Sequence, residues 1–232
     1  MKIIPNSLRF IREWLRFALL TLLVFGLIRA FALEAFTIPT SSMEKTLLVG
    51  DFLFVNKALY GAEIPGTTLR LPAVRDPRRG DVVVFRPPHD PTRVYVKRVV
   101  GVGGDTLEMR RKTLFRNGRP QDEAYTRHSD GGGDARHPGM EWQADFLVAA
   151  EPEWKYAPSR DTWGPLVVPD NRFFVLGDNR DNSEDSRYWG FIGREHITGR
   201  PWFVYLSLED SRGLSGGWIR RIRWDRVGHL VR

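Results

Sequence analysis

Four hydroxyl groups lie close together in the first quarter of the chain, on Thr40, Ser41, Ser42 and Thr46. Pro39 directly precedes them, and its ring fixes its own φ at about −65°. A hydroxyl on such a stiffened loop can act as a nucleophile when a neighbouring group accepts its proton. The same residue types also form ordinary turns, so the hypothesis of a nucleophile depends on whether the chain supplies a base.

Lys97 is the best candidate for that base. It lies in an apolar run, residues 93–100, that we expect to form a strand, where Tyr95, Lys97 and Val99 share one face because side chains alternate with a period of two. If this face is inward, burial lowers the pKa of the lysine by disfavouring its charged form. A neutral amine near pH 7 can serve as a general base. The alternative is that Lys97 reaches solvent at a strand edge, with Arg98 facing solvent beside it.

A third polar stretch, residues 177–190, follows the expected strand 172–176. Charges and hydroxyls alternate this densely either in exposed turns or in polar networks that lie beneath a site. Asp185 and Arg187 are spaced to form an ion pair that would fix the loop. This stretch is therefore a candidate support for the two groups named above.

Other catalytic patterns are weaker. The five histidines are His89, His128, His137, His196 and His229. No local pattern places any of them against Ser42, although a Ser-His-Asp triad remains an alternative because its members need not be close in sequence. Residues 213–217 match G-x-S-x-G, but that motif requires a strand, a sharp turn and a helix in an α/β sheet. The histidines have no metal-ligand spacing and no phosphate-binding loop is present, so we expect neither metal nor cofactor.

The elements that must position these residues begin with an apolar stretch, residues 14–33, interrupted only by Arg16 and Arg29. Twenty helical residues at about 1.5 Å each span roughly 30 Å, the thickness of a bilayer core. Because basic residues precede it, we expect residues 1–13 to be cytoplasmic and the remainder to lie outside. Two alternatives are a cleaved signal peptide, with Ala30-Phe31-Ala32 as an A-x-A site, and a buried core helix.

Beyond this stretch the chain consists of short apolar runs separated by turns rich in Gly and Pro. The expected strands are residues 51–57, 81–86, 93–100, 105–110, 113–116, 166–168, 172–176 and 201–208. This pattern predicts a mainly β protein, an antiparallel barrel or sandwich carrying one N-terminal transmembrane helix. We expect residues 34–117 and 165–210 to form the β-rich core, with 118–164 as an inserted subdomain or long excursion. Residues 211–232 form a basic segment, either a surface helix near lipid headgroups or a solvated tail.

The composition restricts the classes of binding partner and of functional site that the chain can have. The chain has 232 residues, a formal net charge of +7 and a pI of about 10, which suggests an acidic partner such as nucleic acid or anionic lipid. It has no cysteine, which excludes disulfides, thiol nucleophiles and cysteine-based zinc sites.

Four stretches, taken in order, resemble the conserved boxes of bacterial type I signal peptidases, a family of membrane proteases with a Ser/Lys dyad. They are residues 38–51, 79–85, 95–101 and 177–187. The resemblance implies that Ser42 is the nucleophile and Lys97 the base. It also implies that the Thr40 hydroxyl and the Ser42 backbone N–H form the oxyanion hole, that Ser183 orients Lys97, and that Asp185 and Arg187 support the loop.

The resemblance further implies shallow pockets that accept small residues before the cleaved bond. The residues expected to line them are Phe36, Ile38, Leu47, Tyr95 and Val96. The chain departs from the family pattern at Lys45, where proline is usual, and at Gly103, where proline is frequent. Neither departure removes a chemical group, so we still expect activity.

The expected function is that of a membrane-anchored serine endopeptidase that removes signal peptides from exported preproteins after A-x-A sites, through an acyl-enzyme and without metal or cofactor. The resemblance favours an uncleaved, single-pass anchor in the bacterial cytoplasmic membrane, with the catalytic domain outside. Preproteins and anionic lipid are then the expected partners, and nucleic acid is not. Two alternatives stay open: a specialised peptidase that processes pilins for conjugation, and a membrane-tethered basic binding module without catalysis.

Overall fold

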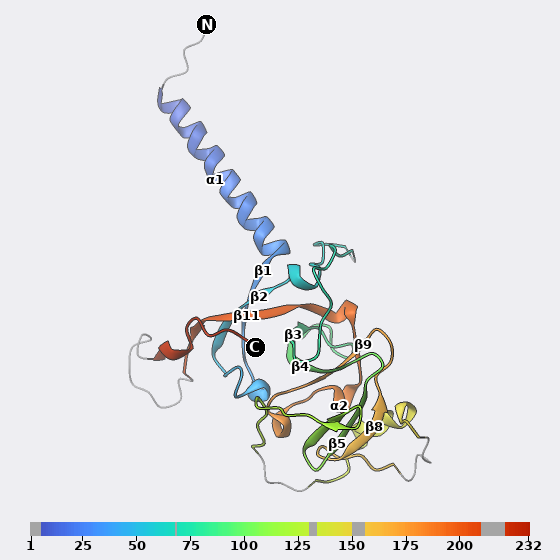
Figure 1. Cartoon of the computed structure of the whole chain (residues 1–232). Coiled ribbons are helices and arrows are strands. Elements are labelled where there is room, and N and C mark those ends of the chain that lie inside the picture. The colour runs from blue at the N-terminus through green and yellow to red at the C-terminus, as the bar shows by residue number, and fades with distance from the viewer. Residues whose placement is uncertain (1–5, 68, 130–133, 150–155, 210–220) are drawn as a thin grey trace.

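The computed structural model describes residues 6–67, 69–129, 134–149, 156–209 and 221–232. A long helix, α1 (Asn6–Phe31), projects from a β-rich body, as Figure 1 shows. Its segment Phe10–Phe31 is long and apolar enough to cross a membrane, and none of it is buried against the rest of the protein. The helix begins before the expected residue 14, because hydropathy marks the depth of a membrane span and not the ends of the helix that contains it.

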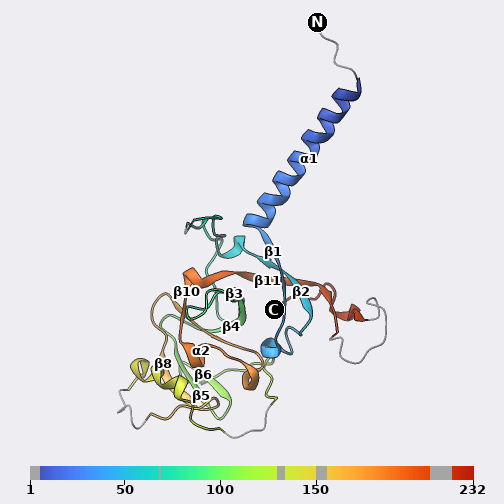
Figure 2. The same cartoon turned by 180° about the vertical axis from the view of Figure 1, so that it is seen from behind.

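The larger of two sheets has seven strands in the order β1-β2-β11-β3-β4-β9-β10, all neighbours antiparallel. Its strands are β1 (Leu33–Thr37), β2 (Asp51–Asn56), β3 (Val82–Phe85), β4 (Tyr95–Val102), β9 (Arg172–Leu176), β10 (Ile192–Gly193) and β11 (Ile197–Ser207). The register of β11 shifts three times along its partners, and such bulges bend a strand. The sheet therefore curls into a half-barrel, with β11 running across it (Figures 1 and 2).

The smaller sheet has four strands in the order β7-β6-β5-β8. They are β5 (Thr106–Arg110), β6 (Thr113–Arg116), β7 (Arg119–Pro120) and β8 (Trp163–Val167). Strands at both ends of the expected excursion 118–164 pair with strands that the sequence assigned to the core, β7 with β6 and β8 with β5. A hairpin at Asn117-Gly118, both with positive φ, joins β6 to β7, whereas the pairing of β5 with β8 is long-range and leaves no local signal.

Short helical turns connect the strands. They are α2 (Ser186–Trp189) and the 3₁₀ turns η1 (Ser41–Met43), η2 (Ala58–Tyr60), η3 (Pro138–Phe146), η4 (Arg180–Asn182), η5 (Arg194–His196) and η7 (Trp224–Arg226). Within 221–232, the described part of the basic C-terminal segment, the chain forms η7 and two isolated bridges, Leu230 with Phe203 of β11 and Ile222 with Leu208 just after it. The G-x-S-x-G match at 213–217 lies outside the described residues.

Strand β3 lies at the centre of the fold, and all four of its residues are buried. Val82 and Val84 belong to an apolar cluster with Ile38 and Met43, whereas Val83 and Phe85 belong to another on the opposite face. A continuous apolar run is typical of a strand that is covered on both sides. The neighbouring strand β4 is consequently covered on both faces where it carries Lys97 and Arg98.

Candidate active site

Ser42 lies in the 3₁₀ turn η1, directly after the edge strand β1. The turn is anchored from both sides, because Ile38 and Met43 are buried in the apolar cluster around β3. The Ile38 N–H donates to the Asp51 carbonyl at 2.8 Å, and the Leu47 N–H donates to the Met43 carbonyl at 2.8 Å. The hydroxyl of Ser42 is thus held on a short, well-anchored segment.

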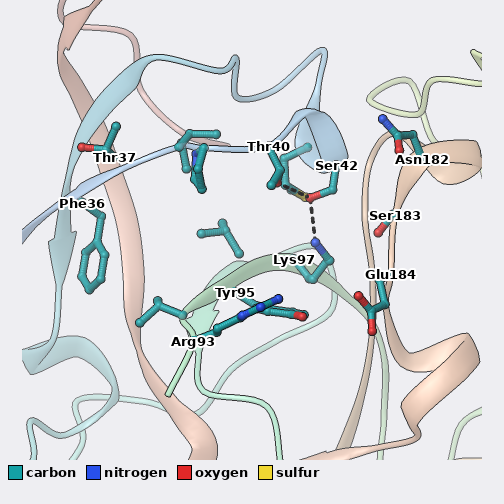
Figure 3. A pocket seen from close by; sticks show the side chains of 15 residues that line it. Phe36, Thr37, Thr40, Ser42, Arg93, Tyr95, Lys97, Asn182, Ser183 and Glu184 are labelled. Carbon is teal, nitrogen blue, oxygen red and sulfur yellow. Dashed lines mark hydrogen bonds between the residues drawn. The ribbon is translucent and has the colours of Figure 1, made fainter. Parts of the chain in front are cut away.

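Lys97 lies in the middle of β4, and its amine is buried. Its Nζ donates a hydrogen bond to Ser42 Oγ at 2.7 Å, which joins residues 55 positions apart (Figure 3). Both side chains line a cavity of about 580 Å³ between the residues that follow β1 and the beginning of β4. The two groups proposed from the sequence as nucleophile and base are therefore in direct contact.

Burial lowers the pKa of Lys97 to about 8. The carboxylates of Asp185 and Glu184 oppose this shift, and the guanidinium of Arg187 adds to it. Within the described part of the chain no carboxylate forms a salt bridge with Lys97. A substantial fraction of the amine is consequently neutral near pH 8 and able to accept a proton.

The third polar stretch, residues 177–190, contains a buried ion pair between Asp185 and Arg187. Arg187 donates from Nε and from one terminal nitrogen to the two oxygens of Asp185, both at 2.8 Å, and both side chains are fully buried. Burial alone would raise the pKa of Asp185, but Arg187 holds it below the ordinary value. Asp185 also accepts from the Gly177 N–H at 3.0 Å. The carboxylate therefore remains ionised and satisfied without pairing with Lys97.

The same stretch holds the loop that carries Ser42 in place. The Asn179 N–H donates to the Ser42 carbonyl at 3.0 Å, and Asn182 Nδ2 donates to Ser41 Oγ at 2.7 Å. Gly177 permits this approach, because a Cβ there would lie 2.6 Å from the Ser42 carbonyl oxygen. The sequence interpretation missed both asparagines, although their place in the last family box was a usable signal.

Profile and sequence comparisons identify the family. The profile described as signal peptidase, peptidase S26, matches residues 11–206. The chain belongs to this family. A signal peptidase I of Pseudomonas aeruginosa is 37% identical over 199 residues, covering 80% of this chain and 69% of that protein. One from Helicobacter pylori is 34% identical over 276 aligned positions, covering 98% and 94% respectively. A solved signal peptidase I from Enterococcus faecalis is 29% identical, covers 55% of this chain and 98% of its own, and has a TM-score of 0.37, too low for a comparison of folds.

Two expectations from the signal peptidase resemblance differ from the structure. Ser183 makes no hydrogen bond to Lys97: its hydroxyl is buried without a partner of good geometry, close to the Asp185 carboxylate and packed against Gly177. Leu47 does not line the cavity, because the turn after Met43 carries it back into the core, where it is fully buried. The amine of Lys97 is instead oriented by Ser42 itself.

The other residues expected to line the substrate pockets do border the cavity of this signal peptidase homologue. Its walls include Phe36, Ile38, Tyr95 and Val96. Thr40 Oγ1 lies 3.4 Å from Ser42 Oγ. The sequence interpretation missed Thr37, Arg93 and Glu184, which also line the cavity. Their positions next to predicted residues were the only signal, since exposed polar side chains have no distinctive pattern.

Arg98 is buried as well, which argues against the alternative in which it faces solvent beside an exposed Lys97. It donates to the two oxygens of Asp178 at 2.8 and 2.7 Å, and Asp178 accepts from the Thr46 hydroxyl at 2.5 Å. The ring of Tyr125 lies 3.9 Å from its guanidinium carbon. The sequence placed Arg98 on the face opposite Lys97, but it did not show that this face is covered.

Lys45, which stands where the signal peptidase pattern usually has proline, adopts a φ of 94° that a proline ring cannot reach. Its Nζ donates to the Thr126 carbonyl at 3.1 Å, and the neighbouring Glu44 pairs with Arg127 at 2.5 Å. The turn after Ser42 is therefore held by a segment of the excursion 118–164. The same segment bridges to the third polar stretch, because the Arg127 N–H donates to the Asp178 carbonyl at 2.7 Å.

The histidines of the described chain do not reach Ser42. His89 lies 4.0 Å from Glu184 and His128 lies 3.4 Å from Asp181, outside the set of residues that line the cavity. Among the described residues, no group of three or more histidine, aspartate or glutamate side chains is arranged to hold a metal ion.

Proposed function

We propose that this protein is a membrane-anchored serine endopeptidase that removes signal peptides from exported preproteins, with Ser42 as nucleophile and Lys97 as general base. The observation that carries the proposal is the 2.7 Å hydrogen bond from Lys97 Nζ to Ser42 Oγ, formed by a buried amine whose pKa is lowered to about 8. Membership of the signal peptidase family supports the reaction class and speaks against a binding module without catalysis.

In the proposed acylation step, the hydroxyl proton of Ser42 passes to neutral Lys97 while Oγ attacks the carbonyl carbon of the peptide. The negative charge that develops on the carbonyl oxygen is stabilised by the Ser42 N–H and, after a rotation, by the Thr40 hydroxyl 3.4 Å from Oγ. The Lys97 ammonium then protonates the leaving amine as the C–N bond breaks. In deacylation, Lys97 takes a proton from the water that attacks the ester carbonyl, and the ammonium returns this proton to Ser42 Oγ as the acyl C–O bond breaks.

The cavity suits an extended peptide. Strand β1 forms one edge of the large sheet, and β4 pairs with β9 only from Arg98 onward, so the backbone of residues 95–97 has an open edge beside the cavity. A peptide can add to such edges as a further strand, with alternate side chains entering pockets. Bulky apolar walls at Phe36, Ile38, Tyr95 and Val96 leave small pockets, which supports specificity for small residues at the A-x-A positions.

The proposal places α1 in the cytoplasmic membrane of a bacterium, with the N-terminus inside and the β-rich body outside. The apolar segment Phe10–Phe31 supports a span, and the basic residues before residue 14 support the orientation. The net charge of +7 supports contact with anionic lipid. Asp185 and Arg187 would keep the loop beneath the amine in place.

The proposed dyad is tested by cleavage of a preprotein with an A-x-A site, using full-length protein in detergent. We expect Ser42→Ala and Lys97→Arg to fold and to lose activity by about 10³-fold or more, since guanidinium stays protonated at all accessible pH values. Single substitutions of the five histidines are the matched controls and should retain substantial activity. Wild-type activity in Lys97→Arg, together with loss of activity in one histidine variant, would replace the dyad by a triad.

The specificity is tested separately by varying the residue just before the cleaved bond. Replacing alanine by phenylalanine should lower kcat/KM by roughly 10- to 100-fold or more, because overpacking a filled site costs about 1–3 kcal/mol. Equal rates for the two substrates would refute the assignment of the pocket walls while leaving the dyad untouched.

A further inference from the structure

Between η2 and β3 a loop of residues 61–75, here called the shoulder loop, exposes three aliphatic side chains close together in sequence. Leu69, Leu71 and Val74 are 65%, 41% and 76% exposed. Pro72 and Ala73, between the last two, are exposed as well. Single exposed aliphatic residues are common on protein surfaces, but a run of them indicates a contact with something apolar.

The described part of the shoulder loop is pinned to the protein, so the exposure does not arise from a segment without anchors. The Leu71 N–H donates to the Ala62 carbonyl at 2.9 Å, and the guanidinium of Arg70 donates to the carbonyls of Ile197 and Glu195 at 2.7 and 2.6 Å. Gly61 has a positive φ, and a Cβ there would lie 2.4 Å from the Leu71 carbonyl oxygen. The backbone thus presents these side chains outward in a defined position.

The shoulder loop lies beside the end of α1. A cleft of about 650 Å³ is lined on one side by Ala30, in the last turn of α1, and on the other by Glu63, Ile64 and Arg70 of the loop. Figures 1 and 2 show the loop next to the base of the helix in both views. Ala30 is next to the end of the 22-residue apolar segment Phe10–Phe31, whose length of roughly 33 Å matches a bilayer core. The loop is therefore level with the proposed boundary between acyl chains and headgroups.

We infer that the shoulder loop inserts Leu69, Leu71 and Val74 into the membrane interface as a second contact beside α1. This inference rests on the proposed placement of α1 in a bilayer. A lipid occupant is favoured over a protein because the shoulder loop borders the end of a helix whose apolar segment is not buried against the described part of the protein. The charges that line the adjoining cleft have both signs, with Lys57 and Arg86 as well as Glu34 and Glu63 among them. Apolar insertion therefore contributes more to the contact than attraction to anionic lipid.

A helix alone lets the body swivel at its last turn, whereas two contacts fix its orientation to the membrane. The shoulder loop would therefore set the height and direction of the cavity at Ser42 relative to the bilayer. A substrate whose apolar segment remains in the membrane would then present its cleavage site at a constant distance from the nucleophile.

The chain has no cysteine, so a single introduced cysteine carries a nitroxide label at one defined site. We would label Leu71→Cys and Val74→Cys in full-length protein reconstituted in phosphatidylethanolamine–phosphatidylglycerol nanodiscs. The controls are Leu20→Cys, in the middle of α1, and Val148→Cys. Val148 is 56% exposed, and its N–H donates to the Pro165 carbonyl in β8, which lies far from α1 in Figure 1. Power-saturation EPR compares collisions of each label with oxygen, which enters the bilayer, and with a water-soluble nickel chelate.

We expect the labels at 71 and 74 to collide more with oxygen than with nickel, as at residue 20, and the label at 148 to show the reverse. Nickel accessibility at 71 and 74 equal to that at 148, with residue 20 in the bilayer, would overturn the inference alone. Protection of 71 and 74 from both reagents would show a protein partner in place of lipid and would also overturn it. A water-exposed label at residue 20 would refute the proposed anchor and the inference together.

Discussion

Lys97 and Arg98 are consecutive residues on opposite faces of β4, and they are almost equally buried, at 4% and 2% exposed. Arg98 meets a carboxylate, that of Asp178, through two hydrogen bonds. Lys97 donates a hydrogen bond to a hydroxyl, that of Ser42, and lies 5.5 Å from the ring centre of Tyr95, with no carboxylate paired to it among the described residues. Both cations lose their hydration, but a counter-charge compensates this loss for Arg98 and none in the described part of the chain does for Lys97. This fold thus lowers the pKa of one buried cation by withholding a counter-charge from it, as the base proposed at Lys97 requires.

The nearby carboxylate that could spoil this arrangement is engaged elsewhere. Asp185 is the largest of the influences that raise the pKa of Lys97, yet its two oxygens are taken by Arg187. Buried carboxylates around the site are in this way paired with arginines, whose charge cannot be titrated at accessible pH. The difference between the two faces of β4 leads to three predictions, ordered by expected effect.

Removing the paired cation should have the largest effect on stability. Arg98→Met leaves Asp178 buried without its partner, and breaking such a pair costs about 3–5 kcal/mol of unfolding free energy. Denaturant unfolding of the detergent-solubilised protein measures this. The matched control is the double variant Arg98→Met with Asp178→Leu, which should recover much of the loss because no uncompensated charge remains. A loss of less than about 1 kcal/mol in Arg98→Met would contradict the compensated half of the comparison.

Removing the unpaired cation should change the pH dependence of stability. The pKa of Lys97 is about 8 in the folded protein and about 10.4 in the unfolded chain. Between these values the unfolded chain binds a proton that the folded protein does not, so this group makes stability rise with pH by about 3 kcal/mol in total. Below pH 8 Lys97 is protonated in both states, and the folded protein is destabilised by the full cost of burying the charged amine.

The matched variant Lys97→Met lacks this group, and we expect the difference in unfolding free energy between wild type and variant to shrink by most of that amount from pH 7 to pH 10. Tyrosines that titrate in the same range cancel in the difference. A difference that stays constant across this range would show that Lys97 is not destabilised by burial.

The smallest effect should come from Glu184, an exposed carboxylate in the cavity wall that raises the pKa of Lys97. Glu184→Gln should shift the acidic limb of the pH–rate profile downward by a few tenths of a pH unit, because solvent screens an exposed charge. Glu195→Gln is the control, since Glu195 is similarly exposed but lies outside the cavity. An upward shift, or equal shifts in both variants, would contradict this assignment.

The β class and most of the strands could be predicted from the sequence because short apolar runs end at Gly and Pro. The smaller sheet could not, since the pairing of residue 106 with residue 167 depends on the whole fold. The contact between Ser42 and Lys97 was expected through the family resemblance, not through spacing, because 55 residues separate them. Strand alternation separated Lys97 from Arg98, yet alternation does not reveal which faces are covered. For that reason the pairing of Arg98 and the burial of Leu47 were not foreseen.

The most direct test is the pKa of Lys97 itself. The chain contains six lysines, so the ¹³Cε signals of ¹³C-lysine protein in micelles can be resolved and assigned with Lys97→Arg. We predict that the signal of Lys97 titrates near pH 8, together with the acidic limb of kcat/KM. A Lys97 signal that titrates above about pH 10 while the enzyme remains active at pH 8 would contradict the account of Lys97 as an uncompensated buried base.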